Sequence, residues 1–375
     1  MNFDLSDDQR QMRDSLARLL KDRYGFEEHR RTAASAEGWS RGIWGSLVEL
    51  GLTALPLPEA HGGLGGSAAD MAVVMEELGA ALTLAPYLST VVLAARAIEL
   101  AGDAALKRSL LPEIAAGRAL LAWAHDEPAG RHARRWIETA ARGTGEGWVL
   151  DGSKANVLYG ASAGMLIVSA RVAGAPGDAG GRGLFLVNAG APGMGLRAYR
   201  LLDGTPAASL TLSAVSARPL GTPGAAGAVI DAVVDAAIAA LCAEATGAMR
   251  AAFAMTVAYL NTRKQFGRLI GENQALRHRV AEMHVAMEAC RSAALLAAIA
   301  IDDPASCDAP RDLAGAKLLI GRHGRFVCQQ AVQLHGGIGM TDEYAVGHTL
   351  QRLTVIDQLM GDADTHLAAL ADMAH

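Results

Sequence analysis

The hydrophobic pattern of this chain changes twice, and the two changes limit the folds that it can adopt. Up to about residue 117, apolar residues such as Leu16, Leu19 and Leu20 recur at helical spacing. Short runs of strand-forming residues separated by glycine-rich turns follow, and from about residue 225 the helical pattern returns. We therefore predict an α+β fold with an N-terminal helical domain (1–117), a middle antiparallel β domain (118–224) and a C-terminal helical domain (225–375).

Local signals place individual elements within these parts. Ser6 followed by Asp7 and Asp8 predicts a helix start, because acidic side chains stabilise the positive end of the helix dipole. The predicted strands are 119–124, 148–150, 165–170, 184–187 and 209–212. The predicted C-terminal helices are 226–262, 272–302, 309–334, 342–360 and 363–374.

Composition excludes several classes of partner. The formal charge of −5 over 375 residues gives no reason to expect nucleic acid or an anionic membrane as the partner. The most apolar stretch, 226–248, contains three acidic residues, so we expect no membrane span. The N-terminus has no basic or apolar leader region, and the four cysteines have no metal-like spacing. We expect a cytoplasmic protein with reduced thiols and no metal site.

The segment Arg263-Lys-Gln-Phe-Gly267 follows one predicted long helix and precedes another. An arginine, an amide and exposed backbone N–H groups at a turn suit a pyrophosphate, because the guanidinium forms two parallel hydrogen bonds with phosphate oxygens. A helix end with a favourable basic residue explains the same residues equally simply.

A second segment, Gln333-Leu-His-Gly-Gly-Ile-Gly339, places three glycines directly after a helix. Glycine lets the backbone approach a ligand closely, although the segment is not the dinucleotide fingerprint because no strand precedes it. A glycine helix end is the alternative. Glu127-Pro128 and Lys154-Ala-Asn156 taken alone indicate only ordinary turns.

In their order and separation these segments resemble the acyl-CoA dehydrogenase family over the whole chain. The most specific matches are Arg263 to Gly267 with the following Gln274, and Gln333 to Gly339. The other matching segments are Trp44 to Leu52, Pro58 to Gly65, Glu76 to Gly79, Trp123 to Pro128 and Gly152 to Asn156. The tail from Gly337 to His348, with Gly361 to Asp364, is similar to the small subunits of pimeloyl-CoA-type dehydrogenases.

The resemblance implies an FAD-dependent enzyme of fatty acid β-oxidation that acts on an acyl-CoA thioester and passes electrons to an electron-transfer flavoprotein. It also implies a homo- or hetero-oligomer whose subunits share FAD sites. Arg263, Gln265, Phe266 and Gln274 would then lie along the adenosine-pyrophosphate arm. Gln333, Gly336 and Gly337 would cradle the ADP portion of the FAD bound mainly by the partner subunit.

The reaction implied by the resemblance needs a carboxylate base near the thioester Cα, and here the chain departs from the family. The stretch that usually carries the base has Met360 or Gly361 at that position, and the alternative base position maps to Ala237. Asp126 also replaces the family's flavin-facing threonine.

Glu244 is our candidate for the catalytic base, because it lies nearly two full helical turns after Ala237 among apolar neighbours. A structural ion pair with a buried arginine is the alternative role for Glu244. Asp362 is a second candidate, although it is better placed as the N-cap of the last helix.

Two other functions stay open at this point. The chain is then either a non-catalytic or half-site subunit that completes the FAD site of a partner, or a related flavin oxidase or monooxygenase. His125, Arg131, Arg134 and Arg135 are expected to be solvated surface charges, or else to meet the terminal carboxylate of a dicarboxylyl substrate.

Overall fold

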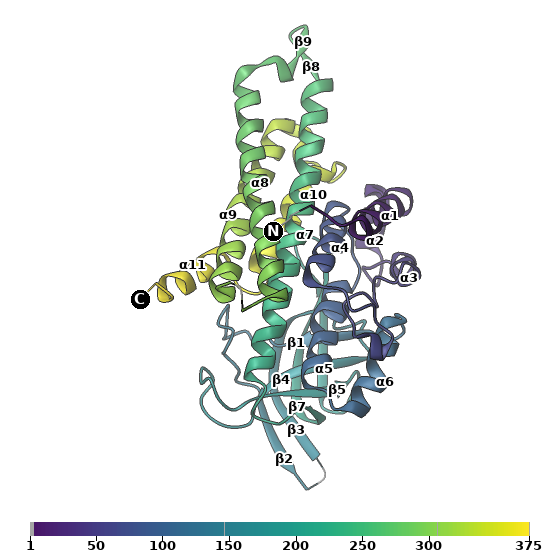
Figure 1. Cartoon of the computed structure of the whole chain (residues 1–375), viewed down its shortest axis with the longest axis vertical. Coiled ribbons are helices and arrows are strands. Elements are labelled where there is room, and N and C mark those ends of the chain that lie inside the picture. Colours follow the sequence, from purple (N-terminus) through teal and green to yellow (C-terminus); the bar gives the residue numbers. More distant parts are fainter. Residues whose placement is uncertain (1–3, 146, 306, 375) are drawn as a thin grey trace. The chain divides into compact units, whose positions relative to one another are not determined.

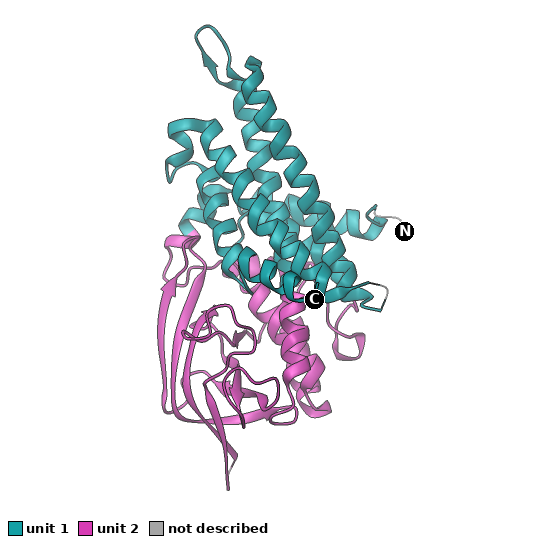
Figure 2. Ribbon diagram, turned by 90° about the vertical axis from the view of Figure 1, so that its left-hand side faces the viewer, with its two compact units in different colours: residues 1–31, 67–83, 238–375 teal, residues 32–66, 84–237 magenta. Residues whose placement is uncertain are grey.

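The computed structural model describes residues 4–145, 147–305 and 307–374 (Figure 1). The chain forms two compact units, each built from discontinuous segments (Figure 2). The helical unit contains residues up to Arg31, Ser67–Thr83 and the chain from Ile238. The sheet unit contains Thr32–Gly66 and Leu84–Ala237. The three-domain division by sequence order stays a prediction, because these units group segments by contact.

The helical unit consists of long helices with few polar residues on their buried faces. Its helices are α1 (Asp7–Arg23), α4 (Ala68–Ala80), α8 (Gln274–Asp302), α9 (Ala309–His335), α10 (Ala345–Gln358) and α11 (Ala363–Asp372). Two further helices cross the boundary between the units in sequence: α2 (Phe26–Ala34) and α7 (Gly227–Thr262). These bounds confirm all five predicted C-terminal helices to within a few residues.

The predicted start of α1 is confirmed by its capping geometry. The Ser6 hydroxyl accepts a hydrogen bond from the backbone N–H of Gln9 at 3.1 Å, and the Gln9 side chain accepts one from the Ser6 N–H at 3.0 Å. This reciprocal pair satisfies two N–H groups that the first helical turn otherwise leaves without a partner.

Helices α4 and α7 approach so closely that two glycines are required between them. A Cβ added to Gly79 would lie 2.0 Å from the Glu244 carbonyl oxygen, and one added to Gly247 would lie 1.8 Å from the Glu76 carbonyl oxygen. Any larger residue at these positions would separate the two helices. This contact fixes the part of α7 that carries Glu244.

The sheet unit contains a seven-stranded sheet together with shorter helices. The strands are β1 (Leu121–Ala124), β2 (Ala140–Thr144), β3 (Gly147–Leu158), β4 (Met165–Arg171), β5 (Arg182–Asn188), β6 (Met194–Arg200) and β7 (Pro206–Leu220). The remaining elements are α3 (Arg41–Glu49), a single 3₁₀ turn (Glu59–His61), a π-helix (Tyr87–Ala94), α5 (Ala95–Ala101) and α6 (Ala104–Ala115). All five predicted strands are present.

The sheet is mainly antiparallel, as predicted, and β1 is an exception. Strand β1 pairs in parallel with β4, with Leu121 opposite Met165 and Ala124 opposite Val168. Parallel neighbours need a long connection rather than a hairpin, and forty residues lie between β1 and β4 in the sequence. The sheet closes on itself because β5 pairs with both β4 and β7. Its core includes Leu150, Leu166 and Phe185.

One helix in the described part of the chain, α8, is long and apolar enough to cross a membrane by length and composition alone. Such a helix is weak evidence for a span, because buried helices of globular proteins pass the same test. The most apolar stretch of the sequence, which lies in α7, does not pass it.

Candidate functional site

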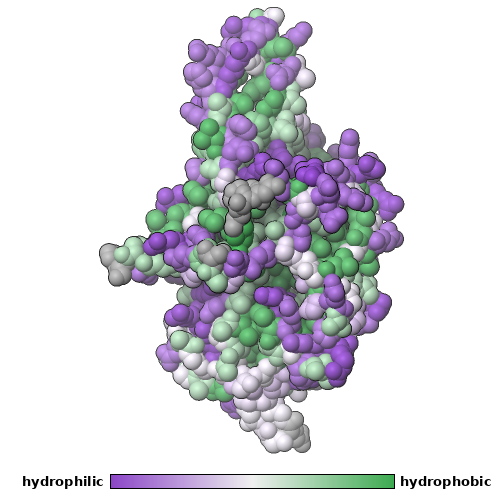
Figure 3. Space-filling view, in the orientation of Figure 1, coloured by the Kyte–Doolittle hydropathy of each residue, from purple (hydrophilic) through white to green (hydrophobic). Residues whose placement is uncertain are grey.

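The segment Arg263 to Gly267 forms a hairpin that projects from the end of the helical unit. It connects α7 to α8 through two short paired strands, β8 (Lys264–Gln265) and β9 (Arg268–Leu269). Phe266 is fully exposed at the tip and adopts a left-handed conformation with φ of 52°. Figure 3 shows hydrophilic residues gathered at this end of the bundle.

The hairpin presents its polar side chains outward. Arg263 and Gln265 are exposed, and within the described residues neither side chain forms a hydrogen bond or an ion pair. Gln274, the first residue of α8, is exposed near the base of the hairpin. The arrangement therefore offers a guanidinium and two amides to a ligand from outside this chain.

The second predicted segment forms an exposed glycine loop after α9, comprising Gly336 to Met340. Gly336 has φ of 66° and ψ of −141°, a backbone conformation that only glycine adopts readily. Gly337 has no such conformation, and a Cβ added there would meet no heavy atom within 4 Å. Nothing in the described chain therefore requires glycine at position 337, whereas close approach of a ligand to the backbone would.

The hairpin and the glycine loop lie at the same end of the helical unit. The ring of Tyr259, one helical turn before Arg263, stacks on the ring of His335 with 4.6 Å between centroids. His335 directly precedes Gly336, and burial lowers its pKa. The structure thus brings together two of the segments that the sequence singled out, although seventy residues separate them.

Glu244 lies inside the helical unit and is paired. Its Oε1 atom lies 2.6 Å from Nη2 and 2.7 Å from Nε of Arg352 on α10. The Glu244 side chain is 6% exposed and the Arg352 side chain 12% exposed, so the pair is largely withdrawn from water. This is the ion pair that the sequence left open as the alternative. The catalytic role of Glu244 stays a prediction.

The loop after α10 contains no carboxylate at the position of the family's usual base. Lys317, fully buried on α9, donates hydrogen bonds to the carbonyl oxygens of Asp357 at 2.9 Å and Gly361 at 2.7 Å. Burial lowers the pKa of Lys317 to about 8. Between these two anchors Met360 adopts a left-handed conformation with φ of 57°. Asp362 caps α11, as predicted, by accepting a hydrogen bond from the Thr365 N–H at 2.8 Å.

The two segments that the sequence predicted to be ordinary turns, at Glu127 and at Lys154, meet inside the sheet unit. The Lys154 ammonium lies 2.7 Å from a carboxylate oxygen of Glu127, and both side chains are almost completely buried. Lys154 also donates to the Ser169 hydroxyl at 3.0 Å. Glu127 accepts hydrogen bonds from the backbone N–H groups of Glu138 and Thr139. This network joins the end of β1 to β3 and β4.

His125 belongs to the same network, so the expectation that it is a solvated surface charge was wrong. Its ring nitrogens form hydrogen bonds with the Ser169 hydroxyl and the Arg134 carbonyl oxygen, each at 2.9 Å. Burial, assisted by the nearby Lys154 charge, lowers the pKa of His125 to about 3. Arg134 itself forms an ion pair with Asp235 at 2.8 Å. The prediction of surface exposure failed because His125 directly follows β1, whose residues are all buried.

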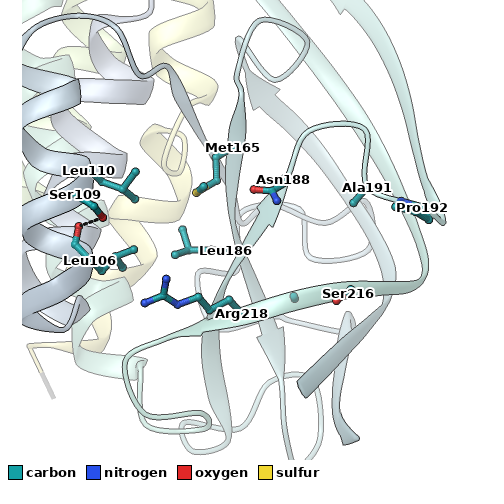
Figure 4. Close-up of a pocket in the computed structure, with 11 residues that line it drawn as sticks. Leu106, Ser109, Leu110, Met165, Leu186, Asn188, Ala191, Pro192, Ser216 and Arg218 are labelled. Atoms are coloured by element: carbon teal, nitrogen blue, oxygen red, sulfur yellow. Dashed lines mark hydrogen bonds between the residues drawn. The ribbon is translucent and has the colours of Figure 1, made fainter. Parts of the chain in front are cut away.

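The sheet unit also contains an open cavity of about 540 Å³ between α6 and the sheet (Figure 4). Figure 4 shows the guanidinium of Arg218 beside the apolar side chains of Leu106 and Leu186. Its other lining residues are Ser109, Leu110, Met165, Asn188, Ala191, Pro192, Ser216 and Ala217. None of the residues predicted for the site lies in it. Across the described residues, no three potential metal ligands are grouped so that they could hold a metal ion.

Comparison with known proteins shows which family shares this sequence and fold. Family models for the N-terminal, middle and C-terminal domains of acyl-CoA dehydrogenase match residues 6–118, 122–215 and 228–374. Acyl-CoA dehydrogenase FadE27 of Mycobacterium tuberculosis is 30% identical over 338 residues, which cover 85% of this chain and 84% of the relative.

Solved structures agree with this match. A variant of the Tcur3481–Tcur3483 steroid ACAD has a TM-score of 0.89 and 32% identity, and the match covers 98% of each chain. The ChsE4–ChsE5 complex from Mycobacterium tuberculosis has a TM-score of 0.89 and 25% identity, and the match covers 100% of this chain and 99% of that one.

The fold and the matched segments define a flavin-dependent oxidoreductase that acts on CH–CH bonds. The chain belongs to the acyl-CoA dehydrogenase family, and its cofactor is FAD. The described residues fit this cofactor, because an exposed arginine, exposed amides and an open glycine backbone match an anionic pyrophosphate and its adenosine.

Proposed function

We propose that this chain dehydrogenates an acyl-CoA thioester between Cα and Cβ, with an FAD that is held jointly by two subunits. Electrons then pass to an electron-transfer flavoprotein. The observation that carries the proposal is the pairing of the outward-facing hairpin with the open glycine loop at one end of the helical unit.

The exposure of these residues supports a shared site. Arg263 has no acidic partner among the described residues, and Phe266 buries none of its surface in this chain. An arginine and an aromatic side chain presented together to solvent are typical of a surface completed by another molecule. The partner subunit is therefore part of the FAD site, and either a second copy of this chain or a related chain supplies it.

The chemistry requires two events at adjacent carbon atoms. A carboxylate takes the α-proton from the thioester, and the bound FAD supplies the acceptor for the β-hydride at its N5 atom. Glu244 is the proposed carboxylate, since it is the only acidic residue on α7 between Asp235 and Arg263. Its pairing with Arg352 opposes this role, because a neighbouring cation stabilises the charged carboxylate and weakens it as a base.

A second candidate function follows from this same pairing. If Glu244 serves only the ion pair, neither position where the family carries a base holds a carboxylate, since one has Met360 or Gly361 and the other Ala237. A partner subunit must then provide the carboxylate. The chain would then be the half-site subunit of a hetero-oligomer. The similarity of this chain to a chain of the ChsE4–ChsE5 complex supports an assembly with a second kind of chain.

The decisive experiment is purification of the chain alone and together with a co-expressed candidate partner. Cofactor content is read from flavin absorbance and from chromatography of the released cofactor. Thioester turnover is followed with an artificial electron acceptor. FAD with turnover in the chain alone supports the dehydrogenase, and turnover only with the partner supports the half-site subunit. A colourless protein that cannot be reconstituted with FAD in either form contradicts both.

A further inference from the structure

The end of β1 and a bulge in β3 form one small polar surface within the sheet unit. The backbone N–H of Ala155 donates a hydrogen bond to the Asp126 carbonyl oxygen at 2.8 Å. Glu127, the residue after Asp126, and Lys154, the residue before Ala155, form their buried ion pair at 2.7 Å. Asp126 is thus held in position by the hydrogen bond to its own carbonyl oxygen and by the ion pair of the next residue, Glu127.

The β3 strand is distorted beside Asp126. Its register with β7 shifts between Lys154 and Val157, and Asn156 there adopts a left-handed conformation with φ of 52°. The Tyr199 hydroxyl accepts a hydrogen bond from the Asn156 N–H and donates one to its side-chain oxygen, both at 3.0 Å. Bulges and left-handed residues of this kind collect at binding sites, because regular strand geometry would not present the required groups.

The Asp126 carboxyl differs from the other polar groups of this surface in its contacts. It is half-buried, yet no described residue forms a hydrogen bond or a close ion pair with it. The neighbouring Glu127 carboxylate, by contrast, is satisfied by Lys154 and two backbone N–H groups. A half-buried carboxyl without a hydrogen-bond donor in its own chain is suited to a ligand that contacts it.

We propose that the Asp126 carboxyl lies against the ring system of FAD and takes up a proton from water when the flavin is reduced. The inference rests on the proposed function, because it requires FAD at this surface. The resemblance supports this location, since Asp126 stands where related chains have a flavin-facing threonine. Here an ionisable group replaces a neutral hydroxyl.

Charge balance explains why Asp126 would bind a proton when the flavin is reduced. When two electrons and one proton enter the bound flavin, it becomes more negative, and a nearby carboxylate then binds a proton more readily. Two electrons would thus be accompanied by two protons, the second bound to Asp126. The charged groups that face Asp126 are Lys154 of β3 and His132 of the loop after β1, and both favour its carboxylate form. Burial outweighs them and raises the pKa of Asp126 to about 6.

The test measures the midpoint potential of the FAD-loaded protein between pH 5 and pH 9. Each proton that accompanies two electrons changes the potential by about 30 mV per pH unit. We expect the wild-type protein to show a slope of about 60 mV per pH unit in an interval that begins near pH 6. Asp126→Asn and Asp126→Thr should show about 30 mV per pH unit throughout.

Glu138→Gln is the matched control, because it removes an exposed acidic charge from the following loop of the same unit. It should retain the wild-type slope. A wild-type slope of about 30 mV per pH unit throughout would overturn the inference whether or not the variants fold. So would identical slopes in the wild-type protein and Asp126→Asn. Absence of FAD from the wild-type protein is a separate result, which contradicts the proposed function itself.

Discussion

Glu244 and Arg352 form a largely buried ion pair between α7 and α10, with 2.6 Å between the carboxylate and the guanidinium. The two residues are 108 positions apart in the sequence. Their pairing ties the helix that precedes the exposed hairpin to the helix that precedes the Met360 loop. Whether the carboxylate also takes part in catalysis decides between the two proposed functions.

The pair should contribute strongly to stability, because removal of one charge leaves the other buried without a partner. Glu244→Leu is expected to lower the free energy of unfolding by about 3–5 kcal/mol. The double variant Glu244→Leu with Arg352→Leu should lose much less. Urea unfolding followed by circular dichroism measures both. Equal losses in the two variants would contradict the expectation that an unpaired Arg352 destabilises the protein.

Catalysis by Glu244 is tested separately with Glu244→Gln, which keeps the size of the side chain and can still accept a hydrogen bond from Arg352. If Glu244 is the base, anaerobic flavin reduction by acyl-CoA should slow by roughly 100-fold or more, with FAD content unchanged. Stopped-flow bleaching of the flavin gives the rate. A wild-type rate in a folded, FAD-loaded variant would assign the base to Asp362 or to a partner subunit.

Arg263→Ala should weaken FAD binding about 10- to 100-fold without affecting folding, because the side chain is exposed and contacts no described residue. Lys264→Ala is the matched control, since it removes a neighbouring exposed cation of the same hairpin. FAD affinity is measured by fluorescence titration of the apoprotein. Equal effects of the two substitutions would show that only the general positive charge of the hairpin matters.

The glycine loop offers an independent test. Gly337→Ala adds a methyl group where no protein atom lies within 4 Å, so stability should stay near the wild-type value. FAD affinity should fall by about tenfold, the equivalent of one hydrogen bond to a charged group. Gly315→Ala is the control, because its added Cβ also meets open space but lies within α9, away from the loop. Unchanged affinity in Gly337→Ala would remove the backbone of the loop from the cofactor site.

The Lys154–Glu127 pair should make the stability of the sheet unit depend on pH. Burial alone would raise the pKa of Glu127, but Lys154 and the backbone N–H groups outweigh it and hold the pKa below its ordinary value. In acid the folded state therefore binds fewer protons than the unfolded state. The stabilisation by the ion pair is fully present above the ordinary pKa of a glutamate, and it is lost as the pH falls through the lowered pKa of Glu127. Glu127→Gln should cost about 3–5 kcal/mol at pH 7 and progressively less in acid. Thermal melts between pH 3 and pH 7 measure the difference, and a constant difference would contradict the assignment.

Much of the fold could be predicted because its signals are local. The Ser6 capping box, the long periodic helices from α7 to α9 and the strands around Leu166 and Phe185 were all predicted at nearly their observed bounds. Strands β2 and β6 were missed, since their exposed faces lack an apolar run. The family was also recognisable, because Arg263 to Gly267 and Gln333 to Gly339 are contiguous motifs.

The tertiary structure decided the rest, because pairing between distant residues leaves no periodic trace in a sequence. The sequence itself determined the helix positions, and it was enough to single out the two exposed segments and to show that no carboxylate stands at Met360, Gly361 or Ala237. The parallel pairing of β1 with β4, the burial of Lys154 against Glu127 and the engagement of Glu244 by Arg352 were decided only when the elements packed. A buried charge must find its counter-charge wherever the fold brings one within reach, and that position depends on the packing of the whole unit rather than on neighbours in the chain.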